Sequence, residues 1–247
     1  MDTKSVLLDV VKHTAGLGII ENIKVTGADD TRLDAIDPDR TVILQARMHD
    51  TVGDFDGEFG MGNLGLLSNL TKLSDYAGDG ASIKVLRQER NGSEVPTTIV
   101  FEDGQGSKDQ YRFMSKEIVD QAMKIAKFKG AEWKVEVQPS AAKVQQLAEV
   151  ASIYSGVEPT FNVKTEEGAL VFEVGSTEGG IVGRRKFAEN VDGELGSVWS
   201  YNLATALNIL KLGMNGTCMM RFGEGVCQID VDSGIGVYSY IMPAISR

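Results

Sequence analysis

The stretch DGEFGMGNLGLLSNL, residues 56–70, has a counterpart in the second half of the chain, DGELGSVWSYNLATALNILKL, residues 192–212. The first residues of these stretches, Asp56 and Asp192, are 136 positions apart. In each half the motif leads into an apolar pattern of helical period, and three strand-like segments follow the helix. Because solenoid repeats span only about 20–50 residues, a repeat of this length predicts two copies of one domain.

The first stretch also contains Gly60, Gly62 and Gly65 in the spacing G-x-G-x-x-G, which is typical of dinucleotide-binding loops. Such a loop needs a strand before it and a parallel crossover after it, but the segments that follow have the spacing of hairpin strands. The second copy lacks glycines at the places of Gly62 and Gly65, and the acid about 24 positions on, Glu89, lies in a charged run. We interpret the glycines as a tight strand-to-helix turn; a nucleotide-binding enzyme that uses this loop is the alternative.

Each half of the chain reads as a helix, three strands, a short strand, a second helix and three more strands. Turn signals recur about every ten residues, which favours antiparallel sheets over alternating strand–helix–strand units. The predicted fold class is therefore α+β, a duplicated domain with antiparallel sheets and two helices per domain. The expected helices cover residues 3–14, 63–73, 141–154 and about 200–212, and the expected strands fall within 20–27, 32–37, 40–48, 81–90, 96–103, 109–115, 160–166, 169–175, 181–189, 216–223, 225–231 and 235–243.

The boundary between the two copies is predicted in the lysine-rich segment KEIVDQAMKIAKFKG, residues 116–130, which could form a helix or a connector. Ser140 is then the N-cap of the helix that opens the second copy. The expected division is a first domain at 1–120, a connector at 121–136 and a second domain at 137–247.

The composition limits the classes of function. The net charge of −10 argues against a protein that binds phosphates over its whole surface, but it allows a local basic stripe. No apolar run reaches the roughly 18 residues of a membrane span and the N-terminus is not a signal peptide, so we expect no membrane partner and a cytoplasmic protein. Two histidines, His13 and His49, suggest no catalytic triad by local spacing, and Cys218 and Cys227 are too few for a zinc site. We expect no enzyme, no cofactor and no metal, with both cysteines as buried apolar groups on facing strands.

Two longer segments resemble a known family. The segments DFDGEFGMGNLGLLSNL, residues 54–70, and VQQLAEVASIYSGVEPTFNVKTEEGALVFEV, residues 144–174, are similar to the DNA sliding clamps, the processivity factors of replicative polymerases. The likeness is to the two-domain trimeric type of T4-like bacteriophages and proliferating cell nuclear antigen, and it covers most of the chain. The segment KEIVDQAMKIAKFKGAEWKVEV, residues 116–137, departs from it. A bacteriophage source, and with it the host cytoplasm, is suggested only by this resemblance.

The resemblance implies a homotrimer closed head to tail into a ring, with the helices lining the hole and the sheets outside. Ring closure would satisfy edge strands that a single subunit leaves unpaired. Such a ring encircles double-stranded DNA without sequence preference and tethers a DNA polymerase, which raises the polymerase concentration at the primer end. A clamp loader is a further expected partner, and the rival class is a structural protein of repeated β-domains.

The resemblance also implies weak contacts to phosphates from lysine and arginine side chains. Lys72 and Lys211 occupy corresponding places in the repeat, in LTKL and ILKL. The alternative is that these cations belong to ordinary solvated helix faces. The expected DNA contacts are Lys4, Lys12, Lys72, Lys143 and Lys211 on helices, and Arg184 and Arg185 in a second basic cluster with Lys186.

Partners of clamps insert a short motif with apolar anchors into a groove near the connector and the C-terminus. In the tail VYSYIMPAISR the expected groove residues are Met242, Pro243 and Ile245, and in the connector they are Ile125 and Phe128. The alternative for Met242 is a place in the core of a last strand that Pro243 ends.

Overall fold

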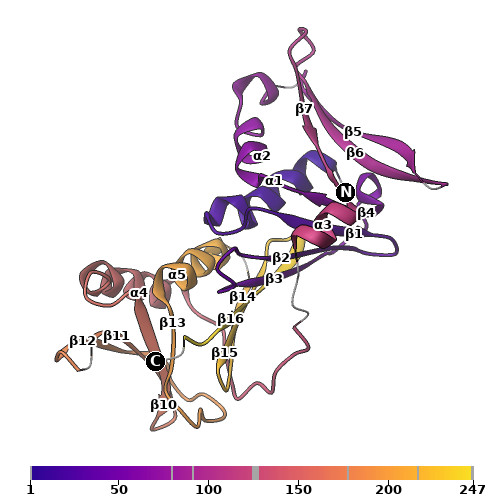
Figure 1. Ribbon diagram of the computed structural model, residues 1–247. Helices are drawn as coiled ribbons and strands as arrows, with labels where there is room; N and C mark the ends of the chain where they lie inside the picture. Colours follow the sequence, from indigo (N-terminus) through magenta and orange to yellow (C-terminus); the bar gives the residue numbers. More distant parts are fainter. Residues whose placement is uncertain are drawn as a thin grey trace. The chain divides into compact units, whose positions relative to one another are not determined.

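The computed structural model describes residues 2–78, 80–90, 92–123, 128–176, 178–215 and 217–245 (Figure 1). The chain forms two compact units. Unit 1 consists of Met1–Lys127 with Gly234–Tyr238, and unit 2 of Phe128–Ser233 with Ser239–Arg247. Each unit combines helices with antiparallel sheets, so the predicted α+β class is confirmed. No helix in the described part of the chain has the length and apolar character to cross a membrane.

Unit 1 contains two sheets, one with the strand order β8-β4-β1-β2-β3 and one with the order β5-β6-β7. The first residues of β16 also belong to this unit, where the His49 N–H donates to the carbonyl of Ile235 over 2.9 Å. The main elements of unit 1 are α1 (Thr3–His13), β1 (Ile23–Gly27), β2 (Thr31–Ile36), β3 (Ile43–Met48), β4 (Gly57–Met61), α2 (Leu64–Leu70), β5 (Ser82–Arg90), β6 (Ser93–Glu102), β7 (Lys108–Arg112), β8 (Met114–Ser115) and α3 (Lys116–Ala122).

From α4 onward, unit 2 repeats the order of elements that unit 1 has from α1 to β7. Its sheets have the strand orders β12-β11-β10-β13 and β16-β15-β14-β9. The main elements of unit 2 are β9 (Val135–Val137), α4 (Ala141–Tyr154), β10 (Thr160–Glu166), β11 (Ala169–Ser176), β12 (Ile181–Ala188), β13 (Trp199–Asn202), α5 (Leu203–Leu212), β14 (Thr217–Gly223), β15 (Val226–Asp232) and β16 (Gly236–Pro243).

The expected helices form for the reasons that the sequence indicates. Asp2 caps α1 by accepting a hydrogen bond from the Ser5 N–H, and Val6 and Val10 lie on its buried face. Ser140 caps α4 in the same way by accepting from the Lys143 N–H. The cysteines are confirmed as buried groups on the facing strands β14 and β15.

The second helix of each copy is shorter than expected. Helix α5 begins at Leu203 and not near 200, because Ser200 pairs with Asn162 of β10 as part of strand β13. Asn202 is extended and its side chain accepts from the Thr205 N–H, which starts the helix. Helix α2 ends at Leu70 and not near 73.

The lysine-rich segment that starts at residue 116 begins with helix α3. Residues 124–127 of this segment lie outside the described residues.

The two copies of the motif do not take the same conformation. In unit 1 the motif runs directly into β4, whereas in unit 2 it lies in a loop and β13 starts only at Trp199. The N-cap residue Asn63 follows Asp56 by seven positions, whereas Asn202 follows Asp192 by ten. Unit 2 therefore has three additional residues at this point.

Gly60 and Gly62 of the first copy allow close packing, whereas Gly65 has no atom nearer than 4.0 Å to an added Cβ; this corrects the tight-turn interpretation. A Cβ added at Gly60 would lie 2.7 Å from the Cβ of Val119 on α3, and one at Gly62 would lie 2.6 Å from the Sδ of Met114. The left-handed residue of the turn is Asn63, with φ 54°. Strand β4 pairs antiparallel with β1 and β8, so the parallel crossover of a dinucleotide-binding loop does not follow it.

Candidate nucleic-acid interface and partner groove

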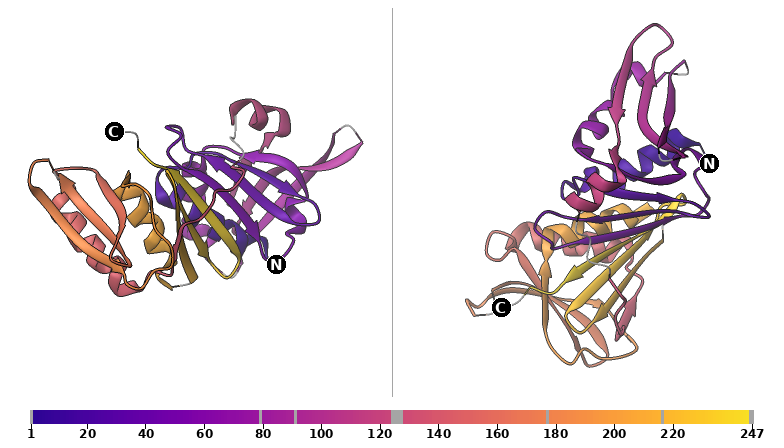
Figure 2. Two further views of the ribbon diagram at one scale, coloured as in Figure 1. Left: turned by 90° about the horizontal axis from the view of Figure 1, so that it is seen from below. Right: turned by 45° about the vertical axis from the view of Figure 1, so that its right-hand side comes forward.

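The candidate nucleic-acid interface consists of the exposed faces of two helix pairs, α1 with α2 in unit 1 and α4 with α5 in unit 2. Helices α4 and α5 cover one face of the sheet β12-β11-β10-β13 (Figure 2). Their apolar stripes face this sheet, so their polar residues remain on the outer side.

Three of the expected lysines are exposed and make no ion pair within the described residues: Lys12, Lys72 and Lys211. Lys12 and Lys211 lie in the last turns of α1 and α5, where the helix dipole favours a cation. Lys72 and Lys211 each follow the N-cap asparagine of their helix by nine positions. Lys211 is still in α5, but Lys72 lies in the turn after α2 ends at Leu70, which corrects its expected place on a helix. These three side chains are available to a phosphate backbone.

The two lysines near helix N-termini are already engaged. The Nζ of Lys4 donates to the carbonyl oxygen of Tyr76 over 3.1 Å, and the Nζ of Lys143 donates to that of Lys186 over 2.8 Å. Both side chains are half-buried. In this structure they fasten their helices to neighbouring segments, which sequence spacing did not indicate.

Arg184 and Arg185 point to opposite faces of β12, which corrects their treatment as one cluster. A Cβ at Gly183 would face the ring of Tyr154 on α4, so Arg185, two residues further, lies on the helix side. Arg184 lies on the other face, where it forms an ion pair of 2.6 Å with Glu166. Only Arg185 shares a side of the sheet with the helices.

A cavity of about 470 Å³ in unit 1 lies between the β2–β3 turn and the end of α3, where the expected connector begins. Asp37 shapes the turn, because its carboxylate accepts hydrogen bonds from the Val42 N–H (2.6 Å) and the Thr41 hydroxyl (2.8 Å). The sequence patterns did not predict this groove. The lining residues are Glu21, Asn22, Ile36, Asp37, Pro38, Arg40, Gln121, Ala122 and Met123.

The expected groove residues in the tail and the connector have different environments. Met242 is only 2% exposed, because the alternation along β16 turns it into the core; this corrects its assignment to a docking surface. Pro243 and Ile245 are exposed, and the Ile245 N–H donates to Ser200 over 2.8 Å. Phe128 is half-buried with its ring centroid 6.2 Å from that of Trp133, and Ile125 lies outside the described residues.

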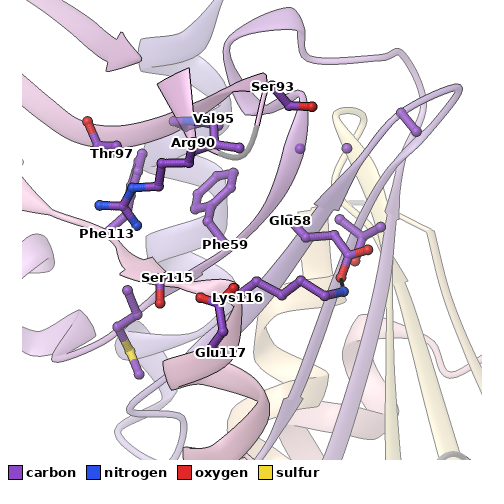
Figure 3. Close-up of a pocket in the computed structure, with 16 residues that line it drawn as sticks. Glu58, Phe59, Arg90, Ser93, Val95, Thr97, Phe113, Ser115, Lys116 and Glu117 are labelled. Carbon is purple, nitrogen blue, oxygen red and sulfur yellow. Dashed lines mark hydrogen bonds and ion pairs between the residues drawn. The ribbon is translucent and has the colours of Figure 1, made fainter. Parts of the chain in front are cut away.

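A second cavity in unit 1, of about 400 Å³, lies between the β5–β6 hairpin and the strands β4 and β8 (Figure 3). Phe59, Phe113 and Val95 form its apolar walls, and Arg90 stands at its rim. We refer to it as the hairpin cavity. Two residues of its lining, Lys116 and Glu58, form an ion pair, and this hydrogen bond lowers the pKa of the Glu58 carboxyl.

The same ion pair belongs to a cluster that attaches α3 to the sheet. Lys24 on β1 contacts Asp120 of α3 over 2.5 Å and Glu58 over 3.3 Å. Together with Val119, which packs on Gly60, these contacts cover the region of the glycine motif. The alternative of an open nucleotide-binding loop therefore has no support in the geometry.

The fold is that of the PCNA sliding clamps. The chain is similar to PCNA of A. fulgidus bound to the C-terminal region of FEN-1, at 10% identity and a TM-score of 0.69, over 99% of this chain and 97% of that one. It is also similar to PCNA from Thermococcus kodakaraensis (11%, TM-score 0.68, 99% and 98%) and to the PCNA2–PCNA3 complex from Sulfolobus tokodaii (13%, TM-score 0.64, 99% and 97%). No protein-family model matches the chain, and no curated protein matches it.

Proposed function

We propose that this protein is a DNA sliding clamp, a ring of three copies that encircles double-stranded DNA and tethers a polymerase. The observation that carries the proposal is the duplicated clamp fold along the whole chain, with an exposed lysine at the same place in both copies. The clamp has no bond chemistry, so its activity depends on ring closure, weak phosphate contacts and partner docking.

Ring closure is assigned to strands β12 and β7. Within unit 1, β3 lies beside the beginning of β16, as the His49–Ile235 hydrogen bond shows. In the repeat β12 corresponds to β3 and β7 corresponds to β16, so β12 of one copy would pair with β7 of the next. Both are terminal strands of their sheets, and β12 exposes Ile181 by 54% and Val182 by 37%. Pairing in a closed ring buries these groups and satisfies both edges.

DNA contact is assigned to Lys12, Lys72, Lys211 and Arg185. Few cations per copy give weak, sequence-independent binding that salt screens strongly, as sliding requires. The chain as a whole has a net charge of −10, so its other surfaces repel DNA.

Docking of the polymerase and of a clamp loader is assigned to the groove at the β2–β3 turn of unit 1. The sequence-based candidates Pro243, Ile245, Ile125 and Phe128 stay predictions that are separate from this groove. The A. fulgidus PCNA structure holds a C-terminal region of its partner FEN-1, which supports recognition of a peptide segment by this fold. The apolar side chains Ile36 and Met123 would receive the anchors of such a segment.

The first test is the mass in solution by light scattering behind a sizing column, across concentration. We expect a species of about 80 kDa, three times the chain mass of 26.7 kDa. The second test is retention on a nicked circular plasmid that is lost when the plasmid is cut. A stable dimer, or retention that survives linearisation, would contradict the proposal.

The basic residues are tested in the same retention assay with Lys72→Glu/Lys211→Glu. We expect the double variant to form the ring but to lose retention at moderate salt, since it removes two phosphate contacts per copy. Lys84→Glu, compared with each single variant, is the control for a charge reversal outside the helix faces, because Lys84 is an exposed lysine on β5 that is ion-paired with Glu102.

A further inference from the structure

The two copies differ at one sheet edge. In unit 2 strand β9 pairs antiparallel with β14, with Val135 opposite Phe222 and Val137 opposite Met220. The strand of unit 1 that corresponds to β14 is β5, because each of them follows the second helix of its unit and begins a hairpin. Within the described residues β5 is a terminal strand with β6 as its one neighbour. Unit 1 therefore leaves open an edge that unit 2 covers.

The hairpin cavity is the second difference between the copies. In unit 2 the loop with the three additional residues fills the equivalent place: Leu195 is buried there, and the carboxylate of Glu224 accepts hydrogen bonds from the Gly196 N–H (2.8 Å) and the Trp199 Nε1 (2.9 Å). In unit 1 the motif enters β4 directly, and the space below the hairpin end remains open (Figure 3).

We propose that the β5 edge and the hairpin cavity together form a docking site for an extended acidic segment of another protein. The segment adds to β5 as an antiparallel strand, as β9 does on β14, and inserts one apolar side chain into the cavity. Backbone hydrogen bonds supply affinity, and the cavity and its rim supply selectivity. The site goes beyond the proposed clamp function and does not depend on it.

Charge indicates an acidic occupant. Strand β5 carries Lys84, Arg87 and Arg90 against one carboxylate, Glu89, in a chain whose net charge is −10. Lys84 pairs with Glu102 and Arg87 with Asp56, so the charge available to an acidic segment is that of Arg90. Arg90, at the cavity rim, makes no ion pair within the described residues. On the covered edge of unit 2 the added strand supplies the acid, because Glu136 of β9 pairs with Arg221 of β14 over 3.0 Å.

The same charges disfavour a second copy of this chain as the occupant. Two β5 strands side by side would bring cations together, and like charges opposite each other destabilise a strand pair. The site also stays accessible in the proposed ring, because β7, which closes the ring, is the opposite edge of the sheet β5-β6-β7.

The probe is a synthetic peptide with the sequence of residues 131–138, AEWKVEVQ, acetylated and labelled with fluorescein. Binding is followed by fluorescence anisotropy, and its place by hydrogen–deuterium exchange. We expect slower exchange in β5 and no change in β14, whose edge is covered. A control peptide with proline at the position of Val135 loses a ladder hydrogen bond and should not bind.

Arg90→Glu should weaken binding of the probe roughly fivefold, whereas Lys12→Glu, an equal change of charge on α1, should leave it unchanged. Unchanged exchange in β5, equal binding of the proline peptide, or equal affinity of Arg90→Glu would each overturn the proposal. So would a peptide-free dimer that Arg90→Glu dissociates, because β5 would then be a self-interface. These measurements need neither DNA nor a closed ring, so their failure is separate from failure of the clamp proposal.

Discussion

At the scale of single residues, His13 is a buried titratable group at the end of α1. Its ring stacks on Tyr238 at 4.1 Å between centroids, and the Tyr238 hydroxyl donates to Asp9. Burial lowers the pKa of His13 from 6.5 to about 4, while Asp9 opposes this and Lys12 adds to it. The folded state therefore holds a neutral imidazole.

This predicts a loss of stability in mild acid. A folded-state pKa below the unfolded one gives stability that is present above pH 6.5 and is lost as the pH falls towards 4, because the unfolded state takes up the proton first. Between pH 7 and pH 5 the free energy of unfolding should fall by about 2 kcal/mol in urea titrations. In His13→Phe, which keeps the stacked ring but cannot be protonated, most of this fall should disappear; an unchanged fall would assign it to other groups.

The glycine motif gives a matched pair of substitutions. Gly60→Ala places a Cβ against Val119, so it should lower the free energy of unfolding by about 1–3 kcal/mol. Gly65→Ala lies on exposed helix α2 with its nearest neighbouring atom 4.0 Å away, and should raise that free energy by roughly 0.5–1 kcal/mol. Thermal and urea unfolding measure both. Equal effects of the two substitutions would refute the close-packing role of Gly60.

At the scale of elements, α5 depends on its N-cap. The side chain of Asn202 accepts from the Thr205 N–H over 2.9 Å, at the point where β13 passes into the helix. Asn202→Ala should lower the free energy of unfolding by about 1 kcal/mol. Asn208→Ala, an exposed position inside the same helix, should leave stability unchanged or slightly raised, because alanine is the better helix former.

At the scale of the whole molecule, the proposed ring depends on the edge strand β12. Val182→Glu places a charge on its exposed apolar end and should shift the mass from about 80 kDa to that of the single chain. Ile153→Glu is the control, because Ile153 is an exposed apolar residue on α4 and is not part of strand β12. Its trimer should persist in light scattering. Dissociation by both variants, or by neither, would contradict the assignment of β12.

The sequence by itself determined the duplicated α+β architecture, because helical and strand periods, caps and turn residues are local properties that repeat along the chain. The N-cap at Ser140 and the buried cysteines followed from such patterns. Only the tertiary structure decided which charged side chains are available to bind phosphate. The Nζ of Lys143, for example, donates a hydrogen bond to the carbonyl oxygen of Lys186, which is 43 positions away in the sequence. The same holds for Gly60, whose need for a missing Cβ comes from Val119 on α3. The unpaired β5 edge and the hairpin cavity also depend on the tertiary structure, because an alternating sequence pattern predicts a strand but not which strands lie beside it.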